Sequence, residues 1–204
     1  MTPTPARTKT EVVADFRRTQ LLDAARASFA RHGVSGTTVE QIAQKARVAK
    51  GTVYLYFRSK DDILWQALAE DLARLRADTV PVITAAQPLR QRLEAFLHGA
   101  VACFDRHRAF IELCHYEMTP DMRRRAKQEM SQINAAQAQA WTTALIDAAR
   151  AGEAVAHDDP ASAALAIVSL SKGLCLQRLG GWTGDPGPGL RGAVDILWKG
   201  IGKS

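Results

Sequence analysis

The residues most suited to binding chemistry lie in a short stretch between Lys50 and Lys60, which reads KGTVYLYFRSK. At helical spacing, one side of this stretch is rich in hydroxyl and aromatic groups, and the other side is apolar. The first side carries Thr52, Tyr54, Leu55 and Tyr56. Hydroxyls and lysines can bind phosphate oxygens, and tyrosine can also contact a thymine methyl group. The stretch therefore predicts a surface that binds a polyanion.

Two short helices are expected to position this surface. Thr38 followed by Gln41 is a capping box, in which each side chain accepts a hydrogen bond from the other residue's backbone amide. Four apolar residues then follow at helical spacing: Val39, Ile42, Ala43 and Ala46. A break at residues 47–50 precedes a second helix over residues 51–57. Two short helices joined by a tight turn are the geometry of a helix-turn-helix.

The charge of the chain is concentrated near this motif. The formal net charge is +6, yet residues 1–60 hold 11 lysines and arginines against 4 acidic residues. The remaining residues hold 16 against 17. Such asymmetry fits one module that faces a polyanion and a second that does not, although a solvated basic face would give the same balance.

Residues 20–64 resemble the DNA-binding motif of TetR-type (tetracycline-repressor-like) regulators. The similarity runs through FARHG, TTVEQIA, KGTVYLYF and SKDDIL, which lie in the same register in four consecutive helices. The resemblance implies an all-helical homodimer, whose N-terminal domain binds DNA and whose variable helical domain senses a small molecule. The residues at positions that contact DNA in the family are Thr38, Lys50, Gly51, Thr52, Tyr54, Tyr56 and Lys60.

The turn between the two short helices departs from the family pattern. The family commonly has AGVS there, whereas this chain has Ala46, Arg47, Val48 and Ala49. Without the glycine, Arg47 must adopt the backbone of the turn, and a positive φ there would carry strain. Without the serine, the second helix lacks a side-chain cap. Arg47 could contact a phosphate instead.

Helical periodicity continues to the end of the chain, and strand patterns are nearly absent. We predict an all-α fold of about nine helices in three segments. Residues 1–10 are expected to form a flexible arm, 11–58 the DNA-binding domain, and 59–204 a ligand-binding and dimerisation domain. A long helix capped by Ser59 is expected to end near Thr79, ahead of Pro81, and residues 180–189 are expected to form a Gly/Pro-rich loop.

The larger domain is predicted to hold a small apolar or aromatic effector. The candidate lining residues are His98, Phe104, Phe110, Cys114, His115, Met118, Trp141 and Cys175. Core packing is the alternative for each of them taken singly, but sites between helices of a bundle are common. The helix from Ser59 to Thr79 would link effector binding to DNA release.

The last two long helices are predicted to form the dimer interface, because both are apolar over much of their surface. The candidate interface residues are Leu170, Leu174, Val194, Leu197, Trp198 and Ile201. Trp198 could also belong to the core. A two-fold dimer predicts a pseudo-palindromic operator.

Other classes of protein are not favoured. No catalytic or nucleotide-binding motif occurs, so an enzyme is not expected, and neither is a cofactor. Cys114 and His115 are adjacent and point about 100° apart, which does not suit a metal site. The three cysteines form no CxxC pair, and together with the lack of an apolar leader they indicate a cytoplasmic protein that does not use a membrane. The expected function is a repressor released by its effector, and an architectural DNA-binding protein without an effector is the alternative.

Overall fold

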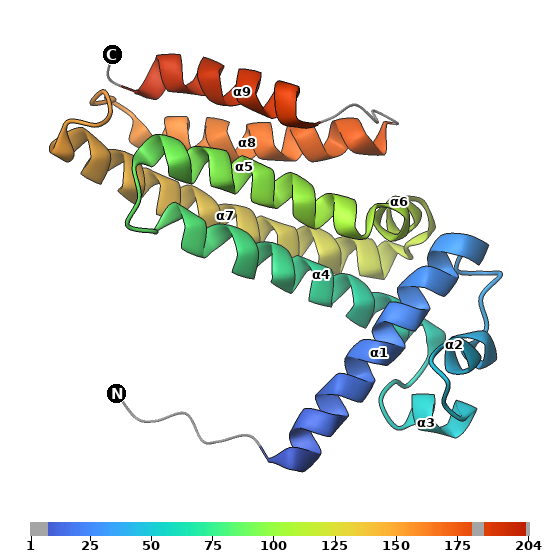
Figure 1. Cartoon of the computed structure of the whole chain (residues 1–204). Helices are drawn as coiled ribbons and strands as arrows, with labels where there is room; N and C mark the ends of the chain where they lie inside the picture. Colours follow the sequence, from blue (N-terminus) through green and yellow to red (C-terminus); the bar gives the residue numbers. More distant parts are fainter. Residues whose placement is uncertain (1–7, 181–185, 203–204) are drawn as a thin grey trace. The chain divides into compact units, whose positions relative to one another are not determined.

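The computed structural model describes residues 8–180 and 186–202, and in this part the chain forms nine helices and no strand (Figure 1). The predicted all-α fold is confirmed. Residues 1–7 of the expected arm lie outside the described residues, and Lys9 and Thr10 belong to the first helix. The helices are α1 Lys9–His32, α2 Val39–Lys45, α3 Lys50–Tyr54, α4 Lys60–Ile83, α5 Leu89–Arg106, α6 Arg108–Glu117, α7 Pro120–Ala151, α8 Pro160–Leu179 and α9 Pro186–Ile201.

The chain divides into two compact units. The N-terminal unit extends to Glu70 and also contains residues 109–122, whereas the C-terminal unit contains residues 71–108 and 123–204. The boundary falls inside α4, so it does not coincide with the position after residue 58 at which the sequence predicts a functional division. That division stays a prediction.

The N-terminal unit is built on α1, which begins at the capping residue Thr8 and ends at Gly33 with a φ of 72°. The capping box of Thr38 and Gln41 is present and starts α2, as predicted. The four apolar residues predicted to form the inner face of α2 are all buried. The core includes Leu21, Leu22, Ala25, Phe29, Ile42, Val53, Phe57, Ile63 and Leu64.

The turn between α2 and α3 has the strained backbone that the sequence predicts. Arg47 has a φ of 57°, and among the described residues no other non-glycine residue has a positive φ. The Arg47 amide donates to the Gln44 carbonyl at 3.0 Å, and the Val48 amide donates to the Ala43 carbonyl at 3.0 Å. This pair of bonds is a Schellman motif, which needs a left-handed residue after the helix and therefore favours glycine.

Replacing Arg47 by glycine is expected to raise the free energy of unfolding by about 0.5–1 kcal/mol. The substitution relieves a left-handed L-residue, and the greater freedom of glycine in the unfolded chain offsets part of the gain. Urea denaturation of the purified protein measures the difference. Arg47→Ala is the matched control, because it removes the same charge but keeps the Cβ that causes the strain. An equal gain in both variants would contradict the backbone explanation.

Two predicted helices have other bounds. α3 has five residues, starts at Lys50, one residue earlier than expected, and ends at Tyr54, three residues earlier than expected; it has no side-chain cap at Ala49. α4 continues through Pro81 to Ile83. Proline removes only one backbone bond here, in the last turn, while the fully buried Ile83 holds the chain in place. The Ile83 carbonyl accepts from the Arg92 guanidinium at 3.1 Å, which satisfies this end of the helix.

The C-terminal unit has its core where α8 and α9 each pack against α5. Trp141 of α7 is fully buried, and its ring meets Phe96 edge-on at 5.5 Å between centroids. Asp159 caps α8, as predicted, by accepting from the Ala161 and Ser162 amides. The predicted loop at 180–189 is shorter than expected, because α9 begins at Pro186; residues 181–185 lie outside the described residues.

Candidate nucleic-acid interface

α3 turns an apolar side inward and leaves a mixed side open. Val53 is fully buried, and Phe57, just beyond the helix, is almost so. On the opposite side Tyr54 is 50% exposed and Leu55 is 82% exposed. Thr52 is half-buried. An exposed leucine and tyrosine on a helix that is anchored from behind can contact the edges of bases in a groove.

Lys50 lies at the start of α3, and it forms an ion pair with Glu40 of α2. Its ammonium also lies 6.0 Å from the centre of the Tyr54 ring. The hydrogen bond with Glu40 raises the pKa of Lys50 and lowers the pKa of Glu40. Both side chains are exposed, so the pair holds α2 against α3 only weakly, and the lysine can exchange the carboxylate for a phosphate.

Lys60 is engaged within its own unit. Its ammonium donates to the carbonyl of Val34 at 2.6 Å and to the carbonyl of Thr37 at 2.9 Å. Both carbonyls belong to residues 33–37, the loop that joins α1 to α2, which we call the α1–α2 loop. The structure thus gives Lys60 a role in holding this loop.

Three residues that the sequence did not single out for this site also fix the α1–α2 loop. The Thr37 hydroxyl lies 2.7 Å from the Gly33 carbonyl and donates to it. A Cβ on Gly36 would overlap the carbonyl oxygen of His32, so only glycine fits there. Glu117, from the end of α6, accepts a hydrogen bond from the Val34 amide at 2.9 Å. Because Glu117 is 83 residues away in sequence, no local pattern could reveal this contact.

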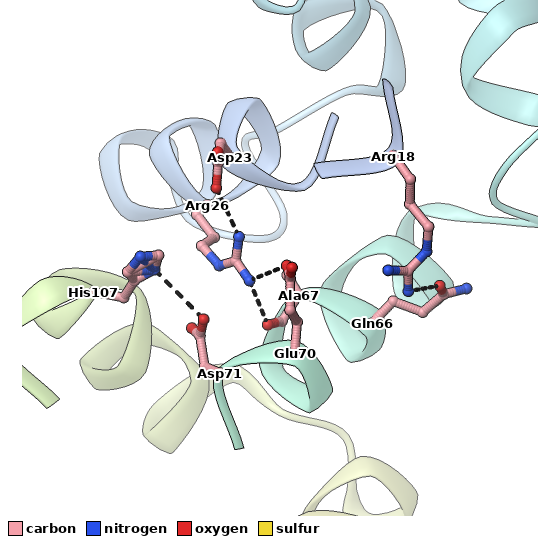
Figure 2. Close-up of polar contacts among 8 residues, drawn as sticks. All are labelled: Arg18, Asp23, Arg26, Gln66, Ala67, Glu70, Asp71 and His107. Atoms are coloured by element: carbon pink, nitrogen blue, oxygen red, sulfur yellow. Dashed lines mark hydrogen bonds and ion pairs between the residues drawn. The ribbon is translucent and has the colours of Figure 1, made fainter. Parts of the chain in front are cut away.

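Polar contacts also join α1 to α4 in the N-terminal unit (Figure 2). The buried Arg26 donates to Asp23, to the carbonyl of Ala67 and to Glu70, at 2.7–2.9 Å. Arg18 donates to Gln66 at 2.6 Å. These contacts fix the start of α4, which carries Lys60. Within the C-terminal unit, the imidazole of His107 lies 3.6 Å from the Asp71 carboxylate.

The predicted effector residues do not form one cluster within either unit. Four of them belong to the N-terminal unit: Phe110, Cys114, His115 and Met118. Phe110 is buried there and stacks on Phe29 at 6.4 Å, and Cys114 is also buried, whereas His115 is exposed. The other four belong to the C-terminal unit, where His98 is exposed, Phe104 and Cys175 are half-buried, and Trp141 is fully buried.

Burial makes the half-buried cysteines poor nucleophiles. Burial raises the pKa of Cys103, and it raises the pKa of Cys175 to about 12. The Cys175 thiol lies 3.8 Å from the Ala100 carbonyl. Both thiols therefore hold their protons at pH 8 more completely than an exposed cysteine does.

We expect both thiols to react at least about tenfold more slowly with a disulfide reagent at pH 8 than a free cysteine does, because the thiolate is the nucleophile. Absorbance of the released chromophore measures the rate, and cysteine-to-serine variants assign it to each position. In denaturant all three thiols should react at the rate of free cysteine. Rapid labelling of Cys175 in the folded protein would contradict this expectation.

All six predicted dimer residues belong to the C-terminal unit and lie in its core or pack against it. Leu174, Val194 and Ile201 are buried in its core. The other three, Leu170, Leu197 and Trp198, pack against the core and are partly buried. Other apolar side chains of the same two helices are open: Leu165 (58% exposed), Leu176 (60%) and Ile196 (74%).

Comparison with known proteins connects the DNA-binding motif to a family. Residues 21–67 match the family described as bacterial regulatory proteins, tetR family. Over 73 residues the chain is 40% identical to the HTH-type transcriptional regulator SrpR of Pseudomonas putida; this match covers 36% of the chain and 34% of SrpR. The chain thus spans about a third of the length of that relative.

Two solved structures share the fold over nearly the whole chain. The fatty acid degradation regulator FadR from Bacillus halodurans has a TM-score of 0.68 at 17% identity, over 95% of this chain and 96% of that one. FadR from Bacillus subtilis in complex with stearoyl-CoA has a TM-score of 0.65 at 20% identity, over 88% and 96%. Residues 21–67 therefore match the DNA-binding region of the tetR family, and the chain as a whole shares its fold with these two regulators.

Proposed function

We propose that this protein is a transcriptional repressor that binds operator DNA as a homodimer and releases it when an apolar small molecule binds. The observation that carries the proposal is α3, which presents Tyr54 and Leu55 outward while Val53 and Phe57 anchor it. This helix belongs to the first 60 residues, which carry the basic surplus of the chain. A protein of this kind acts where the bacterial DNA lies, in the cytoplasm.

In this proposal the residues of α2 and α3 have distinct roles. Thr52, Tyr54 and Tyr56 contact bases and phosphates in the major groove, and the exposed Thr38 lies at the N-terminus of α2, where backbone amides favour a phosphate. A Cβ on Gly51 would meet nothing within 4 Å in this chain. Packing within the protein therefore does not require this glycine, and we infer that it allows the DNA backbone to approach closely.

The test begins with a DNA sequence selected from a random pool by the wild-type protein, whose binding is then measured by fluorescence anisotropy. Tyr54→Ala is expected to weaken this specific binding by about tenfold or more, which corresponds to about 1–3 kcal/mol for a lost base contact. Non-specific binding should change little. Lys45→Ala is a suitable control, because it removes an exposed charge from α2 and not a base contact. Selection of no sequence at all would refute the proposed function.

Lys60 gives a second test, because two roles predict different salt dependence. A lysine that binds a phosphate would reduce the slope of log K against log salt by about one unit when it is removed. We propose that Lys60 instead positions the α1–α2 loop. Lys60→Met is then expected to weaken operator binding about tenfold with an unchanged salt slope. A slope reduced by about one would restore the direct phosphate contact.

For the dimer we propose the exposed apolar surface of α8 and α9 that contains Leu165, Leu176 and Ile196. By length and composition alone α8 could cross a membrane. However, its other side carries Arg178, which is buried and paired with Asp105 of α5. One side of α8 thus belongs to the core of the C-terminal unit, and its other side is apolar and exposed. Such an exposed apolar surface is suited to pack against a second copy of the chain.

For the effector we propose a molecule with a long apolar part. The core of the C-terminal unit is apolar, and the buried indole N–H of Trp141 has no hydrogen-bond partner among residues 8–180 and 186–202. An effector with a carbonyl group could accept from it. Because a neighbour in fold binds stearoyl-CoA, a long-chain acyl-CoA is the first compound to test. Binding can release DNA only if it favours the conformation with the lower operator affinity.

A further inference from the structure

The α1–α2 loop is held from two sides at a single residue, Val34. The carboxylate of Glu117 accepts from the Val34 amide at 2.9 Å, and the ammonium of Lys60 donates to the Val34 carbonyl at 2.6 Å. The Val34 N–H thus donates to an anionic side chain, and the Val34 C=O accepts from a cationic side chain. Hydrogen bonds to charged groups are stronger than those between neutral ones.

The position of this loop decides where the DNA-binding motif begins. Thr37, its last residue, is buried, and the next residue, Thr38, caps α2. Gly33, its first residue, has a positive φ, and a Cβ there would lie 3.1 Å from the Glu117 carboxylate. The loop therefore fits closely against Glu117. A shift of the loop would move the start of α2 and, through the α2–α3 turn, the exposed side of α3.

Glu117 is the last residue of α6, a helix with a particular place in the chain. Residues 109–122 belong to the N-terminal unit, but the chain on both sides of them belongs to the C-terminal unit. Within the N-terminal unit Phe110 stacks on Phe29. Within the C-terminal unit Arg108 donates to the Arg178 carbonyl at 2.7 Å. Arg108 and Glu117 are the first and last residues of α6, so the backbone of this helix joins the two contacts.

We propose that Glu117 is a positioning residue for operator binding and that it connects the state of the C-terminal unit to the DNA-binding motif through the α1–α2 loop. The inference rests on the proposed function as a DNA-binding regulator. It adds a residue that does not touch DNA, and it makes α6 a route of regulation beside the predicted route through α4.

The charge of Glu117 makes the proposal sharply testable. Glu117 is a negative group in the unit that we propose binds a polyanion, so charge alone predicts that its removal strengthens DNA binding. A positioning role predicts the opposite result. A merely structural role predicts a lower melting temperature, with operator affinity unchanged well below that temperature.

The experiment compares Glu117→Ala and Glu117→Gln in the full chain, with DNA selected by the wild-type protein. Glu117→Ala is expected to weaken operator binding about tenfold, to leave the salt slope unchanged and to speed hydrogen exchange of the Val34 amide. Glu117→Gln keeps an acceptor for this amide and is expected to stay within about threefold of wild type. Tyr116→Ala, an exposed neighbour on α6, is the control for a general effect on the helix.

Operator affinity of Glu117→Ala equal to or greater than that of wild type would overturn the proposal. If this variant does not fold, Glu117→Asp replaces it, because the shorter carboxylate keeps the charge but should lose contact with Val34. A failure of the wild-type protein to select any DNA would instead refute the proposed function. The exchange of the Val34 amide would still show whether Glu117 holds the loop.

Arg108→Met tests the route from the C-terminal unit. Alone it is expected to speed Val34 exchange and weaken operator binding by a few-fold. Combined with Glu117→Ala it should add nothing, because both changes act through the same contact. Fully additive effects would show that α6 does not transmit the change, which would overturn this part of the proposal.

Discussion

Replacing Ile196 by glutamate is expected to dissociate the proposed dimer into monomers. Ile196 is 74% exposed on α9, so a charged side chain there should leave the fold of the single chain intact. In the proposed dimer the same side chain is covered by a second copy. A two-fold axis repeats every substitution, so the variant would bury two unpaired carboxylates. We expect the dissociation constant of the dimer to rise at least about 100-fold, equivalent to roughly 3 kcal/mol.

Operator binding should fall with the dimer, because one recognition helix alone cannot contact two successive major grooves. Sedimentation equilibrium measures the mass, and anisotropy measures DNA binding at the same concentration. Val13→Glu is the matched control, since it places the same charge at a 55% exposed apolar residue on α1. A wild-type monomer at micromolar concentration, or a dimer that survives the Ile196 substitution, would refute this interface.

Elements fixed by local physics could be predicted from the sequence. The capping box of Thr38 and Gln41 and the aspartate cap of α8 depend on residues no more than three positions apart, and both are present. The strain at Arg47 also follows from local physics, because a helix followed by a tight turn needs a left-handed residue whatever its side chain is. Helical periodicity likewise identifies the inner face of α2.

Features set by distant contacts could not be predicted. Pro81 would normally end a helix, but the burial of Ile83 keeps the last turn of α4 in place. The predicted contact of Lys60 with DNA followed from its position in the family motif, yet its ammonium bonds two carbonyls of another loop. Within α9, Val194 is buried and Ile196 is exposed, although both side chains are apolar.

Arg26 gives the largest expected effect on stability. Its side chain is buried, yet it donates hydrogen bonds to Asp23, Glu70 and the Ala67 carbonyl (Figure 2). Glu70 is 20% exposed at its side chain, so it is also partly removed from water. Arg26→Met keeps the apolar stem and fills a similar volume, but it leaves the Glu70 carboxylate and the Ala67 carbonyl without this donor.

We therefore expect Arg26→Met to lower the free energy of unfolding by about 2–4 kcal/mol, because it removes one charged partner of a carboxylate that is largely withdrawn from water. Urea denaturation followed by circular dichroism measures this loss. Arg18→Met is the matched control: it also removes a bond from α1 to α4, but one made by a half-buried side chain, so it should cost less than about 1 kcal/mol. The double variant Arg26→Met/Glu70→Met also removes the carboxylate that loses this partner, and it should recover about half of the loss. If the double variant is no more stable than Arg26→Met, the cost comes from packing, and the ion pair does not stabilise the junction of α1 with α4.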